Sequence, residues 1–124
     1  MQNKVPRVAV LMAAYNGERW IHSQLDSIWS QEGVTVDVFV SLDVSSDSTF
    51  SLLQRLKCNH TNLFILPYGE RFGGAAKNFF RLIRDVDFSR FDYIALSDQD
   101  DIWGSGKLHH AIRTIEQDDL DGYS

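Results

Sequence analysis

The chain has 124 residues, a formal net charge of −5, 44% hydrophobic residues and one cysteine, Cys58. This length suits a single domain over residues 1–124, and the apolar content excludes a disordered chain. The acidic balance argues against a nucleic-acid partner, because phosphate backbones are bound through clustered Lys and Arg. One cysteine excludes an intrachain disulfide, and we expect it half-buried at a helix end. We find no signal peptide or membrane-spanning run, which predicts a reducing, cytoplasmic setting.

The first half of the chain alternates strand-like runs with helical patterns. Val8–Ala13 is a continuous apolar run, typical of a strand covered on both faces. Glu18–Gln31 predicts a helix, and Val34–Leu42 predicts a second strand because it is rich in β-branched residues. A second helix is predicted over Asp47–Lys57, with its first residue as the cap. The apolar stripes of the two helices are Ile21, Leu25, Ile28 and Trp29, then Thr49, Leu52, Leu53 and Leu56.

The second half of the chain repeats the alternation. Asn62–Leu66 predicts a third strand, and Gly73–Gly74 precedes a third helix. Phe91–Ser97 predicts the fourth strand, and Lys107–Gln117 predicts the fourth helix. The apolar stripes expected to be buried are Ala76, Phe79, Phe80 and Ile83 on the third helix and Leu108, Ala111, Ile112 and Ile115 on the fourth.

The order of these elements predicts an α/β fold, in which a parallel sheet is covered by helices on both faces. In such a sheet the carboxyl ends of the strands meet at one edge, and ligands bind in the crevice outside that edge. A polar or glycine-bearing segment follows each predicted strand, namely residues 14–17, 43–47, 68–74 and 98–101. We therefore expect a binding site built from these four segments.

Asp98 and Asp100 give the strongest chemical signal in the sequence. They follow the apolar run Tyr93–Leu96 and are two residues apart, which places both side chains on one face of an extended backbone. Two neighbouring carboxylates repel each other unless a cation lies between them. Mg²⁺ and Mn²⁺ prefer oxygen ligands and keep positions open for a substrate's phosphates. The pair predicts a metal-assisted phosphate site, although an Asp before a helix can also be its N-cap.

Taken in order, these segments resemble family-2 glycosyltransferases with the GT-A fold, in particular bacterial enzymes that build surface polysaccharides, including rhamnosyltransferase-like members. The resemblance runs from about Val8 to Ala111. Its elements are Tyr15–Gly17, Gln24–Ile28, Ser41–Thr49, Gly73–Phe79 and Ala95–Trp103. It implies a Rossmann-like sheet of strand order 3-2-1-4. It also implies inverting transfer of a sugar from a UDP- or dTDP-linked donor to a saccharide or lipid-linked acceptor, at the cytoplasmic face of the inner membrane.

The resemblance implies a role for particular residues around the nucleotide. Tyr15 and the backbone near Ala14 would line the base pocket, and Asp43 would accept a hydrogen bond from the pyrimidine ring. Lys77 matches a basic residue that lies near the nucleotide in the family. The resemblance thus gathers these residues around one bound nucleotide.

The resemblance also implies that Asp98 and Asp100 open and close an Asp-X-Asp motif. The first would face the ribose or donor sugar, and the last would bind Mn²⁺ or Mg²⁺ through the donor diphosphate. Val44 stands where glycine is common, so the turn would be reshaped, because valine does not readily adopt positive φ. A complete GT-A domain is about twice this long. The domain is therefore expected to be incomplete, with the general base beyond Ser124.

Ordinary structural roles are expected for several other residues. Asn16 is interpreted as a turn residue, and Arg71 as an exposed arginine. His109 and His110 are interpreted as surface residues, because adjacent helix positions do not share a face. Trp103 is expected to shield the metal loop.

Two other functions are compatible with parts of this pattern. A receiver-like phosphoryl-acceptor module would need an aspartate at the end of its third strand, and Phe64–Pro67 has none. A non-catalytic nucleotide-binding fragment, or a pseudo-enzyme, stays open as an alternative. The fourth strand would be an apolar edge, which predicts self-association because unpaired edges recruit other strands.

Overall fold

The computed structural model describes residues 5–98 and 102–118, which form alternating strands and helices. The elements are β1 (Arg7–Ala14), α1 (Ile21–Trp29), β2 (Thr35–Leu42), α2 (Thr49–Asn59), β3 (Leu63–Ile65), α3 (Ala75–Asp85), β4 (Tyr93–Asp98) and α4 (Lys107–Asp118). The predicted α/β fold is confirmed. Among the described residues, no helix combines the length and apolar character that crossing a membrane requires.

The strands form one four-stranded sheet in the order β3-β2-β1-β4, and every pairing is parallel. The predicted strand order is therefore confirmed. In this register Met12 of the central strand β1 lies beside Val40 of β2 and Ser97 of β4. Residues 8–14 of β1 are all buried, as expected for a strand that has neighbours on both sides and helices over both faces.

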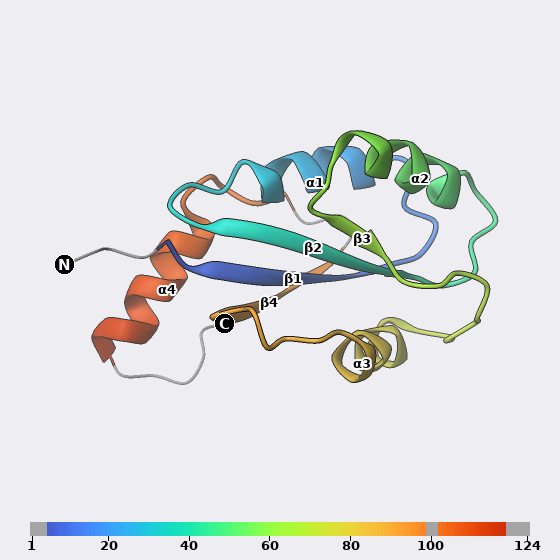
Figure 1. The fold of residues 1–124 in the computed structure, drawn as a ribbon. Coiled ribbons are helices and arrows are strands. Elements are labelled where there is room, and N and C mark those ends of the chain that lie inside the picture. The colour runs from blue at the N-terminus through green and yellow to red at the C-terminus, as the bar shows by residue number, and fades with distance from the viewer. Residues whose placement is uncertain (1–4, 99–101, 119–124) are drawn as a thin grey trace.

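Helices cover the two faces of the sheet unequally (Figure 1). α1 and α2 lie together on one face, α3 lies on the other, and α4 packs near the beginning of β1 and β4. The core lies mainly between the sheet and the two paired helices. Its fully buried members include Val8, Val10, Met12, Ile21, Leu25, Ile28, Val38, Val40, Leu53 and Leu63.

The predicted apolar stripes of three helices are confirmed in their central members. In α1 the buried apolar residues are Ile21, Leu25 and Ile28, and in α2 Leu53 and Leu56 are buried together with Thr49. In α4 the buried residues are Leu108 and Ile112. These helices therefore follow the ordinary rule that an amphipathic helix buries its apolar side.

The prediction for α3 was wrong. Phe80 is 69% exposed and Ile83 is 52% exposed, and Ala76 is exposed as well. The helix instead buries Asn78, Arg81 and Leu82. Polar contacts explain this orientation, because Asn78 and Arg81 each donate hydrogen bonds to Ser41 at the end of β2, at 2.8 Å. Ser41 lies in a buried region, so its backbone carbonyl and its hydroxyl need hydrogen-bond partners from the protein.

Two smaller expectations also met a clear outcome. Cys58 is exposed on α2, not half-buried, because it lies on the side of that helix away from the sheet, opposite Leu53 and Leu56. Among the described non-glycine residues, positive φ occurs at Asn16, so Val44 keeps a negative φ. The turn after β2 therefore does not require the positive φ that glycine would allow at position 44.

Candidate functional site

The carboxyl ends of β1, β2 and β4 meet at one edge of the sheet, as the topology predicted. Ala14 lies beside Leu42, and Ala13 lies beside Asp98. The segments that follow these strands therefore start next to one another. Tyr15 and Asp43 are the first residues beyond the paired ends of β1 and β2.

The turn after β1 is tied to the turn after β2 by hydrogen bonds. Asn16 has φ 46° and donates its N–H to Ser45 Oγ at 3.0 Å, while its Oδ1 accepts the N–H of Ser46 at 2.8 Å. The N–H of Gly17 donates to Thr49 Oγ1 at 2.8 Å. Asn16 is therefore the structural turn residue that the sequence predicted, in the left-handed conformation that Asn tolerates.

Asp47 and Glu18 complete this connection. α2 begins at Thr49 with Ser48 as its cap residue, so Asp47, which the sequence predicted as the cap, lies one position before the observed cap. Its Oδ1 accepts the N–H of Thr49 at 3.0 Å, and its Oδ2 accepts the N–H of Glu18 at 3.2 Å. Glu18 in turn accepts the N–H of Ser48 at 3.1 Å. Burial raises the pKa of Asp47, but the bonds from the Thr49 hydroxyl and these backbone N–H groups outweigh it and lower the pKa overall.

Asp43 is buried and anchors the loop that precedes α3. Its Oδ1 accepts the N–H of Val44 at 2.9 Å and that of Phe72 at 2.8 Å. Its Oδ2 accepts the N–H of Gly73 at 3.0 Å. Burial raises the pKa of this carboxyl, but the backbone N–H groups, including that of Gly74, outweigh it and hold the pKa below its ordinary value. Asp43 is therefore ionised and tightly held at neutral pH.

Asn78 connects α3 to both neighbouring strand ends. It is 2% exposed, and its Nδ2 donates to the carbonyls of Ala14 at 3.3 Å and Ser41 at 2.8 Å. One turn further on, Arg81 donates to Ser41 Oγ and to the carbonyl of Pro67. Neither residue was predicted from the sequence as part of this edge. Their spacing of three, with Leu82 beside them, was the one available signal of a second buried stripe on this helix.

The other nucleotide-site candidates lie on the open side of this edge. Tyr15 is 50% exposed and Lys77 is exposed; Arg71, interpreted from the sequence as an ordinary surface arginine, is exposed as well. Gly73 and Gly74 have φ of 80° and 154°, and a Cβ placed on either would meet nothing within 4 Å. The backbone of this loop is therefore accessible as well as conformationally dependent on glycine.

The predicted metal ligands are only partly described. The backbone of Asp98 ends β4 beside Ala13, while Asp100 lies outside the described residues. Within residues 5–98 and 102–118, no group of three His, Cys, Asp or Glu residues could hold a metal ion. Carboxylate oxygens are nevertheless the donors that Mg²⁺ and Mn²⁺ prefer. The position of the Asp98 backbone fits the predicted site at the carboxyl edge.

Trp103 and the histidine pair lie away from that edge. Trp103 is buried in the main core, and its backbone N–H donates to Ser27 Oγ of α1 at 3.1 Å. Its predicted role as a shield of the metal loop stays a prediction. His109 and His110 are exposed on α4, as expected for surface residues.

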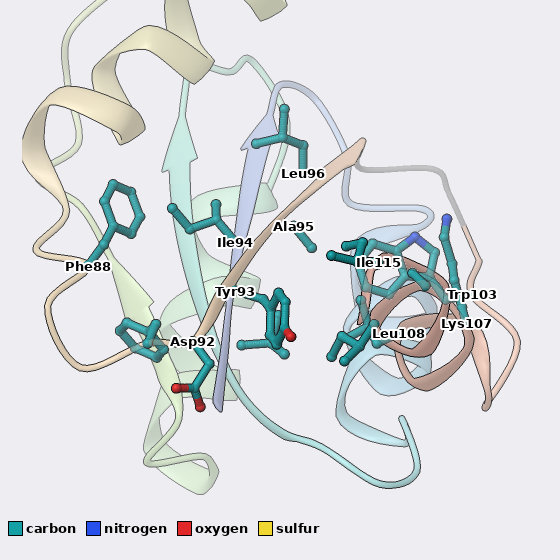
Figure 2. A pocket seen from close by; sticks show the side chains of 14 residues that line it. Phe88, Asp92, Tyr93, Ile94, Ala95, Leu96, Trp103, Lys107, Leu108 and Ile115 are labelled. Atoms are coloured by element: carbon teal, nitrogen blue, oxygen red, sulfur yellow. The ribbon is translucent and has the colours of Figure 1, made fainter. Parts of the chain in front are cut away.

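A groove of about 720 Å³ follows the outer margin of β4. Figure 2 shows β4 crossing it, with Phe88 on one side and the α4 residues Leu108 and Ile115 on the other. Ile94 and Leu96 remain 52% and 55% exposed there. This apolar groove is separate in character from the polar carboxyl edge.

A parallel α/β sheet whose carboxyl edge collects Asp43, Tyr15 and a carboxylate-bearing strand end belongs to the general class of folds that bind ligands at that edge. The profile of the family described as "Glycosyltransferase like family 2" matches residues 6–122. The chain therefore belongs to this family, and the resemblance found in the sequence is confirmed.

Curated relatives are considerably longer than this chain. The chain is 45% identical over 114 residues to the dTDP-rhamnosyl transferase RfbG of Shigella flexneri, covering 91% of the chain and 39% of the relative. It is 33% identical over 120 residues to the succinoglycan biosynthesis protein ExoO of Rhizobium meliloti (strain 1021), covering 97% of the chain and 32% of the relative. The chain thus spans between about a third and two fifths of these relatives' length.

Solved structures share the fold. S. aureus TarS 1-349 in complex with UDP-GlcNAc matches with a TM-score of 0.74 at 22% identity, over 90% of this chain and 31% of that one. The mannosyltransferase PcManGT from Pyrobaculum calidifontis, in complex with GDP-Man and Mn²⁺, matches with a TM-score of 0.72 at 26% identity, over 89% of this chain and 32% of that one. The GT-A type of fold is confirmed, as a partial domain.

Proposed function

We propose that the chain is the donor-binding part of an inverting glycosyltransferase that acts in cell-surface polysaccharide synthesis. The observation that carries the proposal is the 45% identity to a dTDP-rhamnosyl transferase over nearly the whole chain. The donor would be a nucleotide-diphosphate sugar, UDP- or dTDP-linked, and the acceptor a saccharide or lipid-linked hydroxyl. The same proposal locates the chain in the cytoplasm, at the inner face of the membrane where lipid-linked acceptors are used.

In this proposal the nucleotide lies over the ends of β1 and β2. Tyr15 is half exposed next to Ala14 and offers an aromatic surface to the base. Asp43 lies at the floor of the same region, and three of its acceptor positions are already used by the backbone. Lys77 is exposed near the start of α3 and would approach the phosphates. Asp98 would face the ribose or the donor sugar.

Asp100 and Asp98 would hold a divalent cation, Mn²⁺ or Mg²⁺. When bound, such a cation neutralises the charge that develops on the leaving nucleotide. This chain's own contribution is to keep carboxylates beside the strand ends and to orient the nucleotide. The acceptor hydroxyl must lose its proton to a general base, which we propose lies in polypeptide that the longer relatives carry in addition to the matched region.

The donor proposal is tested by titrating this chain with UDP, dTDP and GDP, each with and without Mn²⁺, by calorimetry. We expect the pyrimidine nucleotides to bind more tightly than GDP, and we expect binding to weaken at least about tenfold when Mn²⁺ is removed, because carboxylates and diphosphate then repel each other. The alternative, a binding fragment without activity, is decided by a sugar-transfer assay. No nucleotide binding under any condition would contradict the donor-binding role.

We also propose that the chain associates with a second copy through the margin of β4. β4 has one neighbouring strand, β1, among the described residues, so its other side is an edge of the described sheet at which a further strand could pair. Two large apolar side chains of β4 itself, Ile94 and Leu96, are exposed. Antiparallel pairing of two β4 strands would continue the sheet and place Ile94 and Leu96 beside side chains of the second copy, reducing their exposure.

A further inference from the structure

Asn78 makes a connection that no assigned site residue makes. Its amide group donates to Ala14 at the end of β1 and to Ser41 near the end of β2, so a single side chain spans two strands. The residue that follows Ala14 is Tyr15, and Asp43 follows Ser41 by two positions. The two strand ends that Asn78 joins therefore lead directly into the segments of the candidate nucleotide site.

The hydrogen bonds around Ala14 leave little freedom for these strand ends. The carbonyl of Ala14 accepts the N–H of Asp43 at 2.9 Å as well as the amide of Asn78 at 3.3 Å. A carbonyl oxygen has two lone pairs, so its acceptor capacity is filled. The spacing between β1, β2 and α3 at this point is fixed by short-range contacts, not by apolar packing alone.

We propose that Asn78 is a positioning residue for the nucleotide site: its amide sets the spacing of the β1 and β2 ends and so fixes the relative placement of Tyr15 and Asp43. The inference rests on the proposed donor-binding function and adds a residue to it. Since Asn78 is 2% exposed, it acts through the strand ends and not by touching the nucleotide.

Two neighbours on α3 separate positioning from general stability. Arg81 is also buried, but its bonds go to Ser41, Pro67 and Asp85, so it supports the β2 side and the segment after β3. Leu82 is fully buried on the same helix and contributes apolar packing. Leu82→Ala is thus a matched control that loosens α3 without removing a bond to a strand end.

The experiment compares the wild-type chain with Asn78→Ala and Leu82→Ala. UDP and dTDP are titrated in the presence of Mn²⁺, at a temperature where circular dichroism shows that all three proteins are folded. We expect Asn78→Ala to bind at least about tenfold more weakly than the wild type, because two carbonyls lose the donor that aligns them. Leu82→Ala is expected to bind within about twofold of the wild type, because the strand ends keep their bonds.

A second readout uses the ligand-free proteins. The backbone amide resonances of Tyr15 and Asp43 should move in Asn78→Ala and stay in place in Leu82→Ala. A wild-type chain that binds neither nucleotide overturns the proposed function, and the positioning role with it. A wild-type chain that binds, with both variants binding alike and with the resonances of Tyr15 and Asp43 unmoved in Asn78→Ala, overturns the positioning role alone.

Discussion

Two margins of the same sheet carry opposite kinds of side chain. One is the carboxyl edge at the ends of β1 and β2, and the other is the outer margin of β4. At the first, buried polar groups such as Asp43 and Asn78 bond to backbone groups from other segments. At the second, the large apolar side chains of Ile94 and Leu96 are more than half exposed. The carboxyl edge is thus held by hydrogen bonds between buried side chains and the backbone, whereas the margin of β4 leaves apolar side chains open to solvent.

The largest expected loss of folding stability comes from Leu82 on α3, and its neighbour Ile83 serves as the comparison. Leu82 is fully buried and Ile83 is 52% exposed, although both are large and apolar. Leu82→Ala should lower the free energy of unfolding by about 2–4 kcal/mol, because it leaves a cavity. Ile83→Ala should change it by less than about 0.5 kcal/mol. Urea denaturation of both variants at low protein concentration measures the difference, and equal costs would mean that both faces of α3 are covered.

Asp43→Asn should lower folding stability by removing hydrogen bonds at the carboxyl edge. The amide that replaces the carboxylate has one acceptor oxygen instead of two, so at least one N–H among Phe72, Gly73 and Val44 loses its partner. We expect a loss of about 1–3 kcal/mol in the free energy of unfolding at neutral pH. Thermal and urea unfolding measure it, with Asp26→Asn, an exposed carboxylate on α1, as the control.

The same variant has a predicted pH dependence. The pKa of Asp43 is lower in the folded chain than in the unfolded chain, so the stability it contributes is fully present above its unfolded pKa. That contribution is lost as the pH falls through the lower, folded pKa. The stability gap between wild type and Asp43→Asn should therefore be constant above about pH 5 and shrink below about pH 4. A gap that grows on acidification would contradict this account.

The smallest expected change in folding stability, but a clear change in association, comes from the margin of β4. Leu96→Lys places a charge where we propose that a second copy pairs, so light scattering should show less dimer than in the wild type at the same concentration. Gln54→Lys adds the same charge on exposed α2 and should leave association unchanged. A wild-type chain that stays monomeric at high concentration would remove the basis of this prediction.

The sequence predicted the fold because its signals are local. Strands and helices alternate clearly, and parallel sheets with this order of elements gather their carboxyl ends at one edge. The stripes of α1, α2 and α4 were also predictable, since one set of apolar residues at helical spacing exists in each. The family resemblance gave the strand order before the structure did.

The orientation of α3 was not predictable from its own residues. The helix carries two candidate stripes, one apolar through Phe80 and Ile83 and one mixed through Asn78, Arg81 and Leu82. Hydrophobic periodicity favours the first stripe. The second is buried because Ser41 and Ala14, more than thirty residues earlier in the chain, present carbonyls and a hydroxyl to it.

The α/β fold, the edge at which the polar segments meet, and the place of Asp43 and Tyr15 at that edge were all predictable from the amino-acid sequence. Three features became visible in the fold alone: the buried face of α3, the bridge that Asn78 makes between two strand ends, and the bonds that Asp43 accepts from the loop before α3. The two groups of features differ in how far apart the interacting residues lie along the sequence. Apolar periodicity depends on residues that are close together in the sequence. The partners of a buried polar group are instead backbone atoms from distant segments, and only the fold brings them within hydrogen-bonding distance.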